Sequence, residues 1–274
     1  MNDILVITVN YKNTIITENF INSLENLDTS DKVELIVVDS ASTRKTKENL
    51  QSLLRRSTLK TQLIDSRSNT FYWGGVALAL KTLDINYANG PSWIIACNND
   101  ILFSQPEIFS KLIKLDSTKY HVIAPSILST KTGENLNPCM TKPSNIIDKL
   151  YYSIIFLNPI TGKLIHTIRK MTQKLFYNVF KKSLPKSGKI YAPHGAFMIF
   201  SKHYFTKGGW IDDSCKLYGE EITIAEIAKR NEIPIFFMPE LEVLHVAHSS
   251  TGTNWYNWFY HAKETNKYLK KTYF

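Results

Sequence analysis

The sequence predicts an α/β protein in which a mostly parallel β-sheet is flanked by helices. Three short apolar segments rich in β-branched residues, at residues 4–9, 33–38 and 93–96, are predicted as buried strands. Helical patterns separate them, and such a β-α-β-α-β order is typical of a parallel sheet covered on both faces. The chain has 274 residues, of which 43% are hydrophobic, enough for the core of a single domain and too many for a disordered chain.

The remaining elements follow in chain order. After the first strand we expect a helix with Thr17 as its N-cap and with Phe20 and Leu24 on one face. The other expected elements are a helix at 47–56, a strand at 62–65, a strand at 196–200, a helix at 220–230, strands at 235–238 and 243–246, and a helix at 255–271 within a C-terminal segment 253–274.

Composition excludes several classes of protein. No apolar run approaches the ~20 residues that span a bilayer, and the first residues lack the basic region and long apolar stretch of a secretory signal. The three cysteines form no CxxC pair, which suits reduced thiols better than a disulfide framework or a zinc site. These features predict a cytoplasmic protein.

The net charge of +9 is concentrated in one segment. Residues 141–190 hold ten of the 33 Lys and Arg residues but one of the 24 acidic residues, so the rest of the chain is formally neutral. We predict that this segment is a basic helical insertion made of two helices, divided near Pro159 and Gly162.

The second helix of the insertion has two kinds of face. Its apolar stripe comprises Leu164, Ile168, Met171, Leu175 and Val179, and its lysines, expected on the opposite side, are Lys163, Lys170, Lys174 and Lys181. Such a helix either packs its apolar stripe on the core or lies on an anionic membrane surface. A nucleic-acid interface is a third interpretation of the same charge.

Polar side chains at strand ends indicate a site. Asp39 and Asp100 each follow a predicted strand, and ligands of parallel sheets bind beyond the carboxyl ends of the strands. An acid there can hold a divalent cation against phosphates, although an Asn-Asp pair after a strand is more often a turn. His245, on a later strand, is a candidate ligand for manganese or a buried core histidine.

Two neighbouring acids, Glu220 and Glu221, begin the predicted helix at 220–230. Acidic residues at a helix N-terminus are stabilising because their negative charge interacts favourably with the positive end of the helix dipole. Two adjacent carboxylates also repel each other, which raises the pKa of one of them and suits a general base.

Several motifs in fixed order resemble family 2 glycosyltransferases, especially the bacterial rhamnosyl- and galactofuranosyl-transferase-like branch. They are Ile7-Thr8-Val9-Asn10-Tyr11, Val37-Val38-Asp39-Ser40, Asn69-Thr70-Phe71-Tyr72-Trp73-Gly74-Gly75, Asn98-Asn99-Asp100, Gly195-Ala196-Phe197-Met198, Gly208-Gly209-Trp210-Ile211-Asp212 and Tyr218-Gly219-Glu220-Glu221. The resemblance implies a GT-A fold and a nucleotide-sugar donor.

The resemblance also implies roles for single residues. Asp39 would bind the N3–H of a uracil or thymine base, and Asp100 with His245 would hold Mn²⁺ or Mg²⁺ on the diphosphate. Glu221 would be the catalytic base, with Glu220 beside it. The implied nucleotide-sugar-binding residues are Thr8, Asn10, Asp39, Asn69, Trp73, Gly74, Gly75, Asn98, Asn99, His194 and Gly195.

The expected activity is therefore inverting, metal-dependent transfer of a hexosyl or deoxyhexosyl group from a UDP- or dTDP-sugar to a hydroxyl of a glycan or lipid-linked acceptor, in bacterial surface polysaccharide synthesis. We expect a protein peripheral to the inner face of the cell membrane, with no nucleic-acid partner, and the terminal helix is compatible with a homodimer. A nucleotidyltransferase normally has a Gly-rich loop near the first strand, and residues 9–14 contain no glycine. A non-enzymatic nucleic-acid or membrane-binding protein leaves the acids and His245 unexplained.

Overall fold

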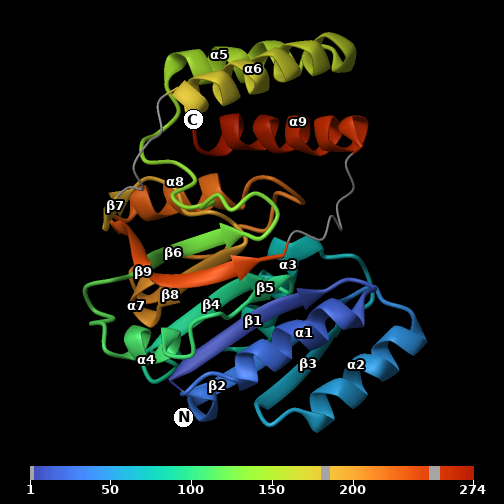
Figure 1. Ribbon diagram of the computed structural model, residues 1–274, viewed down its shortest axis with the longest axis vertical. Coiled ribbons are helices and arrows are strands. Elements are labelled where there is room, and N and C mark those ends of the chain that lie inside the picture. Colours follow the sequence, from blue (N-terminus) through green and yellow to red (C-terminus); the bar gives the residue numbers. More distant parts are fainter. Residues whose placement is uncertain (1–2, 180–185, 247–253) are drawn as a thin grey trace.

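The computed structural model describes residues 3–179, 186–246 and 254–274. Within them a mixed sheet has the strand order β3-β2-β1-β4-β8-β6-β9-β5, with β7 paired to β9 (Figure 1). Its parallel half consists of β1 (Ile4–Asn10), β2 (Val33–Ser40), β3 (Lys60–Ser66) and β4 (Trp93–Asn98). The predicted α/β class with a parallel sheet is confirmed for this half.

The other half of the sheet runs partly antiparallel. It contains β5 (Ile101–Leu102), β6 (Val122–Ser129), β7 (Gly188–Ile190), β8 (Phe197–Ser201) and β9 (Ile235–His245). Strand β8 pairs antiparallel to both β4 and β6, whereas β6 and β9 are parallel. The two strands predicted at 235–238 and 243–246 are one continuous strand. The break in the apolar pattern between them coincides with a shift in the register of the pairing with β6, between Pro125 and Ser126.

Helices cover both faces of the sheet. They are α1 (Thr14–Glu25), α2 (Arg44–Arg56), α3 (Phe71–Leu83), α4 (Ile108–Ile113), α7 (Lys202–Thr206) and α8 (Glu220–Arg230). Alternate residues of β1 join opposite cores: Val6 packs with residues of α1, α2 and α4, and Ile7 with residues of α3, α7 and α8. Period-two alternation in a doubly covered strand therefore builds two apolar layers.

Two local predictions were wrong. Asn13, not Thr17, caps α1, with its side chain accepting from the backbone N–H of Ile15. Thr17 is buried within α1, where its hydroxyl donates to Asn10. The resemblance implies a Gly-rich donor loop at residues 69–75, but Gly74 and Gly75 lie in the first turns of α3.

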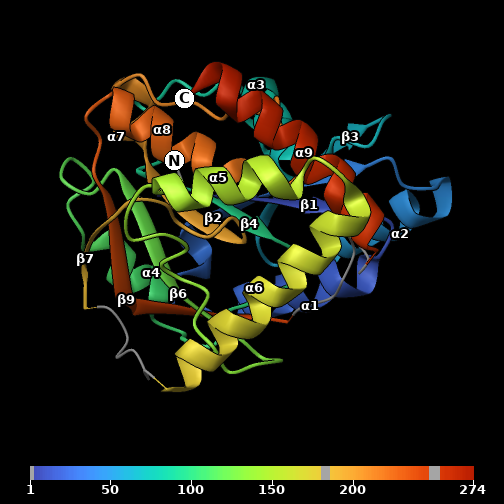
Figure 2. The same cartoon turned by 90° about the horizontal axis from the view of Figure 1, so that it is seen from above.

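Three further helices form a layer above the sheet: α5 (Ile146–Ile155), α6 (Pro159–Val179) and α9 (Trp255–Thr272). Figure 1 shows α9 between the sheet and the α5–α6 hairpin, and Figure 2 shows the hairpin from above. Buried Ile155 and Phe156 pack with Phe259 and Ala262 of α9. None of the helices in the described residues is long and apolar enough to cross a membrane. Of the residues expected to form the two stripes of α6, Lys181 lies outside the described residues, as do the side chains of Lys174, Leu175 and Val179.

Candidate active site

A cavity of about 700 Å³ opens beyond the carboxyl ends of β1, β2 and β4. The sheet contributes Ser40, Asn98 and Asp100 to its wall, and α9 contributes Asn257 and His261 from the opposite side. Strand β1 pairs in parallel with β2 as far as Asn10 and with β4 as far as Val9. The carboxyl ends of these strands therefore lie at one edge of the sheet. The cavity is thus where an open α/β sheet is expected to bind a ligand.

Asp100 and His245 meet at one side of this cavity. Asp100 lies in the turn between β4 and β5, and the pairing of Ile101 with His245 brings β9 beside it. Nε2 of His245 lies 3.2 Å from Oδ1 of Asp100. That oxygen is buried and accepts no aligned hydrogen bond from the described residues. A carboxylate oxygen aimed inward without a donor suits a cation, as does a neighbouring imidazole.

Glu220 and Glu221 stand at the N-terminus of α8, on another side of the cavity. Glu221 accepts a hydrogen bond of 3.0 Å from the backbone N–H of Gly195, whereas Glu220 lines the cavity. Burial, followed by the charge of Glu221, raises the pKa of Glu220 to about 7. Burial also raises the pKa of Glu221. Glu220 is therefore the carboxylate that both faces the cavity and titrates near neutral pH.

Gly195 is the point at which the two carboxylates converge. A Cβ atom there would lie 2.9 Å from Oε1 of Glu220 and 2.9 Å from Oε1 of Glu221. His194, the preceding residue, has its ring centre 6.5 Å from that of His245, and burial, followed by the charge of His245, lowers the pKa of His194 to about 4. His194 is consequently neutral at physiological pH.

A chain of hydrogen bonds joins the predicted base-binding residue to the turn after β4. Asn10 donates to Oδ1 of Asp39 over 3.0 Å, Thr17 donates to Asn10 over 2.8 Å, and Asn99 donates to Thr17 over 2.9 Å. Oδ2 of Asp39 is buried and accepts no hydrogen bond from the described residues. An external N–H donor would satisfy it.

Other predicted donor-binding residues divide into two groups. Asn69 lines the cavity and accepts from the hydroxyl of Ser40 over 3.1 Å. Trp73 and Gly75 instead belong to the apolar core: Trp73 is 2% exposed, and a Cβ at Gly75 would lie 2.6 Å from Val9. Thr8 is also fully buried, within β1. None of these three residues is among those that line the cavity.

Sequence reasoning did not select several residues that line the cavity. Lys12 adds a positive charge near the end of β1, and its φ of 63° places it in the left-handed region. Asn257 and His261 come from α9, more than 150 residues after Asp100 in the chain. No local pattern distinguishes these three from other surface residues. Among the described residues no cluster of three or more His, Cys, Asp or Glu side chains is arranged to hold a metal ion.

Comparisons with known proteins agree with this geometry. The sequence profile of "Glycosyl transferase family 2" matches residues 3–206. The low-salt glycan biosynthesis hexosyltransferase Agl10 of Haloferax volcanii is 25% identical over 247 residues, which are 89% of this chain and 67% of the relative.

Solved structures of similar fold are larger proteins. The mannosyltransferase PcManGT from Pyrobaculum calidifontis, in complex with GDP-Man and Mn²⁺, has a TM-score of 0.54 at 15% identity and covers 93% of this chain. TarS 1–349 of S. aureus, in complex with UDP-GlcNAc, has a TM-score of 0.56 at 13% identity over 90% of this chain. GalNAc-T7 with UDP, GalNAc and Mn²⁺ has a TM-score of 0.60 at 11% identity over 90% of this chain.

This chain spans 59%, 59% and 43% of those three proteins, respectively. Their likeness shows the fold, which is the GT-A fold implied by the motifs. The profile match extends over more than half of the sequence and includes the strand ends that line the cavity. The chain therefore belongs to glycosyl transferase family 2.

Proposed function

We propose that the protein is an inverting glycosyltransferase that moves a hexosyl or deoxyhexosyl group from a nucleotide diphosphate to an acceptor hydroxyl. One observation carries this proposal. A single cavity is lined on one side by Asp100, whose carboxylate contacts His245, and on another by Glu220, a carboxylate with a pKa of about 7. Inverting transfer needs both, because the leaving diphosphate must be neutralised while the attacking hydroxyl loses its proton.

The donor is proposed to be a UDP- or dTDP-sugar. The carboxylate oxygen of Asp39 that has no protein donor suits the N3–H of uracil or thymine. The similar structures are complexes with UDP-GlcNAc, with UDP and with GDP-Man, so GDP-sugars belong in the same test. Lys12, in the cavity wall, supplies a positive charge for a diphosphate.

Asp100 and His245 fit a divalent cation of the Mn²⁺ or Mg²⁺ type. The fit rests on the buried oxygen of Asp100 without an aligned donor and on the nearby imidazole. Two side chains leave most coordination positions to other groups, which the donor diphosphate and water would supply. When bound, the ion supplies Lewis-acid stabilisation of the leaving diphosphate.

The carboxylates at the start of α8 are proposed to accept the proton of the acceptor hydroxyl. As the bond from the anomeric carbon to the diphosphate breaks, the acceptor oxygen bonds to that carbon and its proton passes to a glutamate. The resemblance implies Glu221 for this role. The cavity wall favours Glu220, because Glu220 lines the cavity and Glu221 does not.

The acceptor is proposed to be a glycan or lipid-linked hydroxyl used in surface polysaccharide synthesis, with the enzyme peripheral to the inner face of the membrane. The curated relative is described as a hexosyltransferase of glycan biosynthesis. The cavity wall formed by Asn257 and His261 of α9 lies opposite the strand ends, where an acceptor has room to bind.

A donor screen tests the proposal. The full chain is incubated with UDP-, dTDP- and GDP-sugars, with and without Mn²⁺, and the release of nucleotide diphosphate is measured. We expect one nucleotide class to be turned over and the rate to need metal. Incorporation of the nucleotide itself into a product, with release of pyrophosphate, would instead indicate a nucleotidyltransferase.

A further inference from the structure

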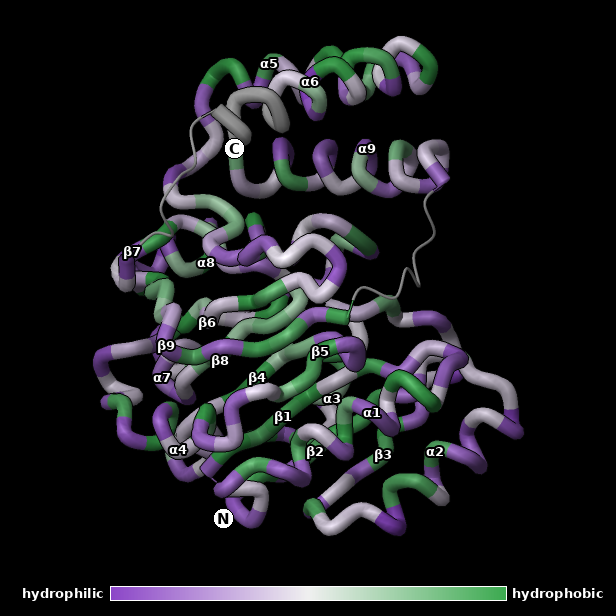
Figure 3. Tube along the Cα trace, in the orientation of Figure 1, coloured by the Kyte–Doolittle hydropathy of each residue, from purple (hydrophilic) through white to green (hydrophobic). Residues whose placement is uncertain are grey.

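Both helices of the α5–α6 hairpin expose an apolar stripe to solvent. We name as the hairpin face the side chains of Ile147, Leu150, Ile154, Ile160, Leu164 and Ile168. Each of these is between 41% and 70% exposed. Figure 3 shows apolar colouring along α5 and α6 at the end of the molecule farthest from the sheet. Large apolar side chains exposed together on one hairpin in this way mark an interaction site.

The hairpin face is not the side by which these helices pack on the protein. The opposite side of α5 holds Ile155 and Phe156, which are buried against α9. On α6, the ring of His166 contacts Trp255 and Trp258 of α9 in tilted arrangements, at ring-centre distances of 5.4 and 5.0 Å. The core interpretation of the apolar stripe is therefore wrong for Leu164 and Ile168, which α9 leaves exposed.

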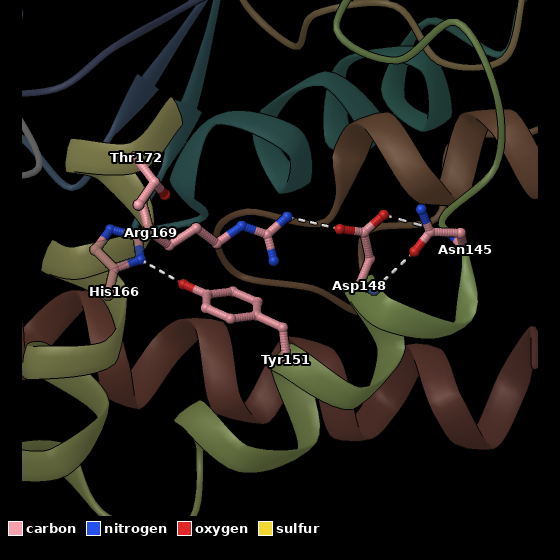
Figure 4. A network of polar contacts seen from close by, with 6 residues as sticks. All are labelled: Asn145, Asp148, Tyr151, His166, Arg169 and Thr172. Carbon is pink, nitrogen blue, oxygen red and sulfur yellow. Dashed lines mark hydrogen bonds and ion pairs between the residues drawn. The ribbon is translucent and has the colours of Figure 1, made fainter. Parts of the chain in front are cut away.

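The hairpin is internally braced, so it presents its outer face as a unit. Arg169 of α6 forms an ion pair of 2.6 Å with Asp148 of α5, and its guanidinium lies 4.0 Å from the ring centre of Tyr151 (Figure 4). The hydroxyl of Tyr151 lies 2.7 Å from Nδ1 of His166. At Gly162 the two helices come so close that a Cβ would lie 2.3 Å from the carbonyl oxygen of Ile155.

The surface around the hairpin face is positive. Asp148 is the one acidic residue between residues 141 and 190, and it forms an ion pair with Arg169. Lys142, Lys163 and Lys170 are exposed. At 3.6 residues per turn, Lys163 and Lys170 lie about 100° around α6 from the middle of the apolar stripe. The two lysines therefore flank the stripe, whereas the sequence pattern predicted them on the opposite side of the helix. Flanking lysines can reach headgroups while the stripe enters the acyl region.

We propose that the hairpin face docks on the surface of an anionic lipid bilayer. Charge complementarity selects this occupant, because the flanking lysines match anionic headgroups and the stripe matches acyl chains. A second copy of the chain would bring two positive surfaces together. A nucleic acid would satisfy the lysines but leave the six apolar side chains against a phosphate backbone.

The position of α9 gives the docking surface a role. One side of α9 packs on the hairpin, and Asn257 and His261 of the same helix line the cavity. Docking would therefore set the distance and orientation of the cavity relative to a bilayer that carries a lipid-linked acceptor. This consequence rests on the proposed function, whereas docking itself does not.

Co-sedimentation of the full chain with vesicles tests the proposal. We expect binding to vesicles of phosphatidylcholine and phosphatidylglycerol in equal amounts, and much weaker binding to phosphatidylcholine alone. Binding should weaken between 0.1 and 1 M salt, as the Debye length falls from ~10 to ~3 Å. The triple variant Lys142→Gln, Lys163→Gln, Lys170→Gln should lower the partition coefficient roughly 100-fold. Leu164→Ser with Ile168→Ser should lower it about tenfold or more.

Matched variants elsewhere separate docking from general effects. Lys45→Gln, Lys114→Gln, Lys131→Gln removes three exposed lysines outside the hairpin, and Ile15→Ser removes a side chain that is 67% exposed on α1. Neither should change binding. All variants should keep wild-type nucleotide release on a soluble acceptor, which separates loss of docking from failure of the proposed function. Unchanged vesicle binding by Leu164→Ser with Ile168→Ser would overturn the proposal. So would a lipid-free dimer that this double variant converts to a monomer.

Discussion

Nε2 of His245 and Oδ1 of Asp100 lie 3.2 Å apart, although the two residues are separated by 145 positions in the chain. Their contact is held by backbone on both sides. Ile101 pairs with His245 between β5 and β9, and the N–H of Val246 donates to the carbonyl of Asp100 over 2.9 Å. Backbone hydrogen bonds on both sides therefore fix the relative position of the two side chains.

The first prediction concerns this pair. We expect EDTA to abolish turnover, and Asp100→Ala to lower nucleotide affinity only when Mn²⁺ is present, because the side chain acts through the ion. The loss of activity should be roughly 100-fold or more. Titration calorimetry with UDP, with and without Mn²⁺, measures the binding effect.

His245→Ala should show the same metal-dependent loss, whereas His203→Ala, at a histidine remote from the cavity lining, should not. Full activity in EDTA would contradict the assignment and leave Lys12 as the cavity-lining cation that neutralises the leaving group.

The second prediction concerns the two glutamates. Glu220→Gln keeps the shape of the side chain but cannot accept a proton, so we expect kcat to fall by ~10²–10⁴ with donor affinity nearly unchanged. Glu221→Gln should reduce kcat less and shift the acid limb of the pH–rate profile to lower pH, because it removes the charge that raises the pKa of Glu220.

The reverse result, an inactive Glu221→Gln and an active Glu220→Gln, would assign the base to Glu221, as the resemblance implies. Steady-state kinetics of both variants with one donor and one acceptor decide between the two residues.

The third prediction concerns pH and stability. The pKa of Glu220 rises from its ordinary value near 4.5 to about 7 on folding. A raised carboxyl pKa contributes stability below pH 4.5 that is lost as pH rises through 7. Glu220→Gln should therefore be more stable than the wild type at pH 8, by roughly 3 kcal/mol, with little difference at pH 4.5.

Urea unfolding at the two pH values measures this difference. The activity of the wild type should rise with pH to a plateau above 7, since the same group must lose its proton to act as a base. A flat stability difference across this range would show that the carboxylate of Glu220 is well solvated.

The fourth prediction uses two adjacent glycines of α3. A Cβ at Gly75 would lie 2.6 Å from Val9, so Gly75→Ala should push α3 away from β1 and destabilise the fold by about 1–3 kcal/mol. At Gly74 the nearest atom would be 3.6 Å away, an ordinary contact. Gly74→Ala should instead stabilise the helix by up to about 1 kcal/mol.

Thermal unfolding of both variants tests this contrast. Equal stability of the two would mean that α3 does not pack on β1 as closely as the structure shows.

The fifth prediction concerns Gly195. A Cβ there would approach Cγ of Glu220 to 2.7 Å and an oxygen of each glutamate to 2.9 Å. Gly195→Ala should displace both carboxylates and lower kcat about tenfold or more, while the fold and the affinity for nucleotide are retained. Normal kcat in this variant would show that the position of the carboxylates does not control the rate.

The sequence by itself determined the elements that depend on local patterns. The apolar runs at β1, β2 and β4 and the helical spacing between them predicted a parallel sheet, because burial on both faces requires continuous apolar strands. The polar residues after these strands, Asp39 and Asp100, predicted the ligand edge for the same reason: parallel strands end on one side.

Only the tertiary structure decided which residues share the site. Glu220 and Glu221 are equivalent in a sequence pattern, and the fold places Glu220 in the cavity wall, whereas Glu221 accepts a hydrogen bond from Gly195, which precedes β8. Trp73 lies within a donor-like motif but is buried, because α3 begins two residues before it and turns its side chain into the core. His261 reaches the cavity because α9 packs across it. Contacts between residues that are distant in the chain decide such positions, and the local periodicity of the sequence does not reveal those contacts.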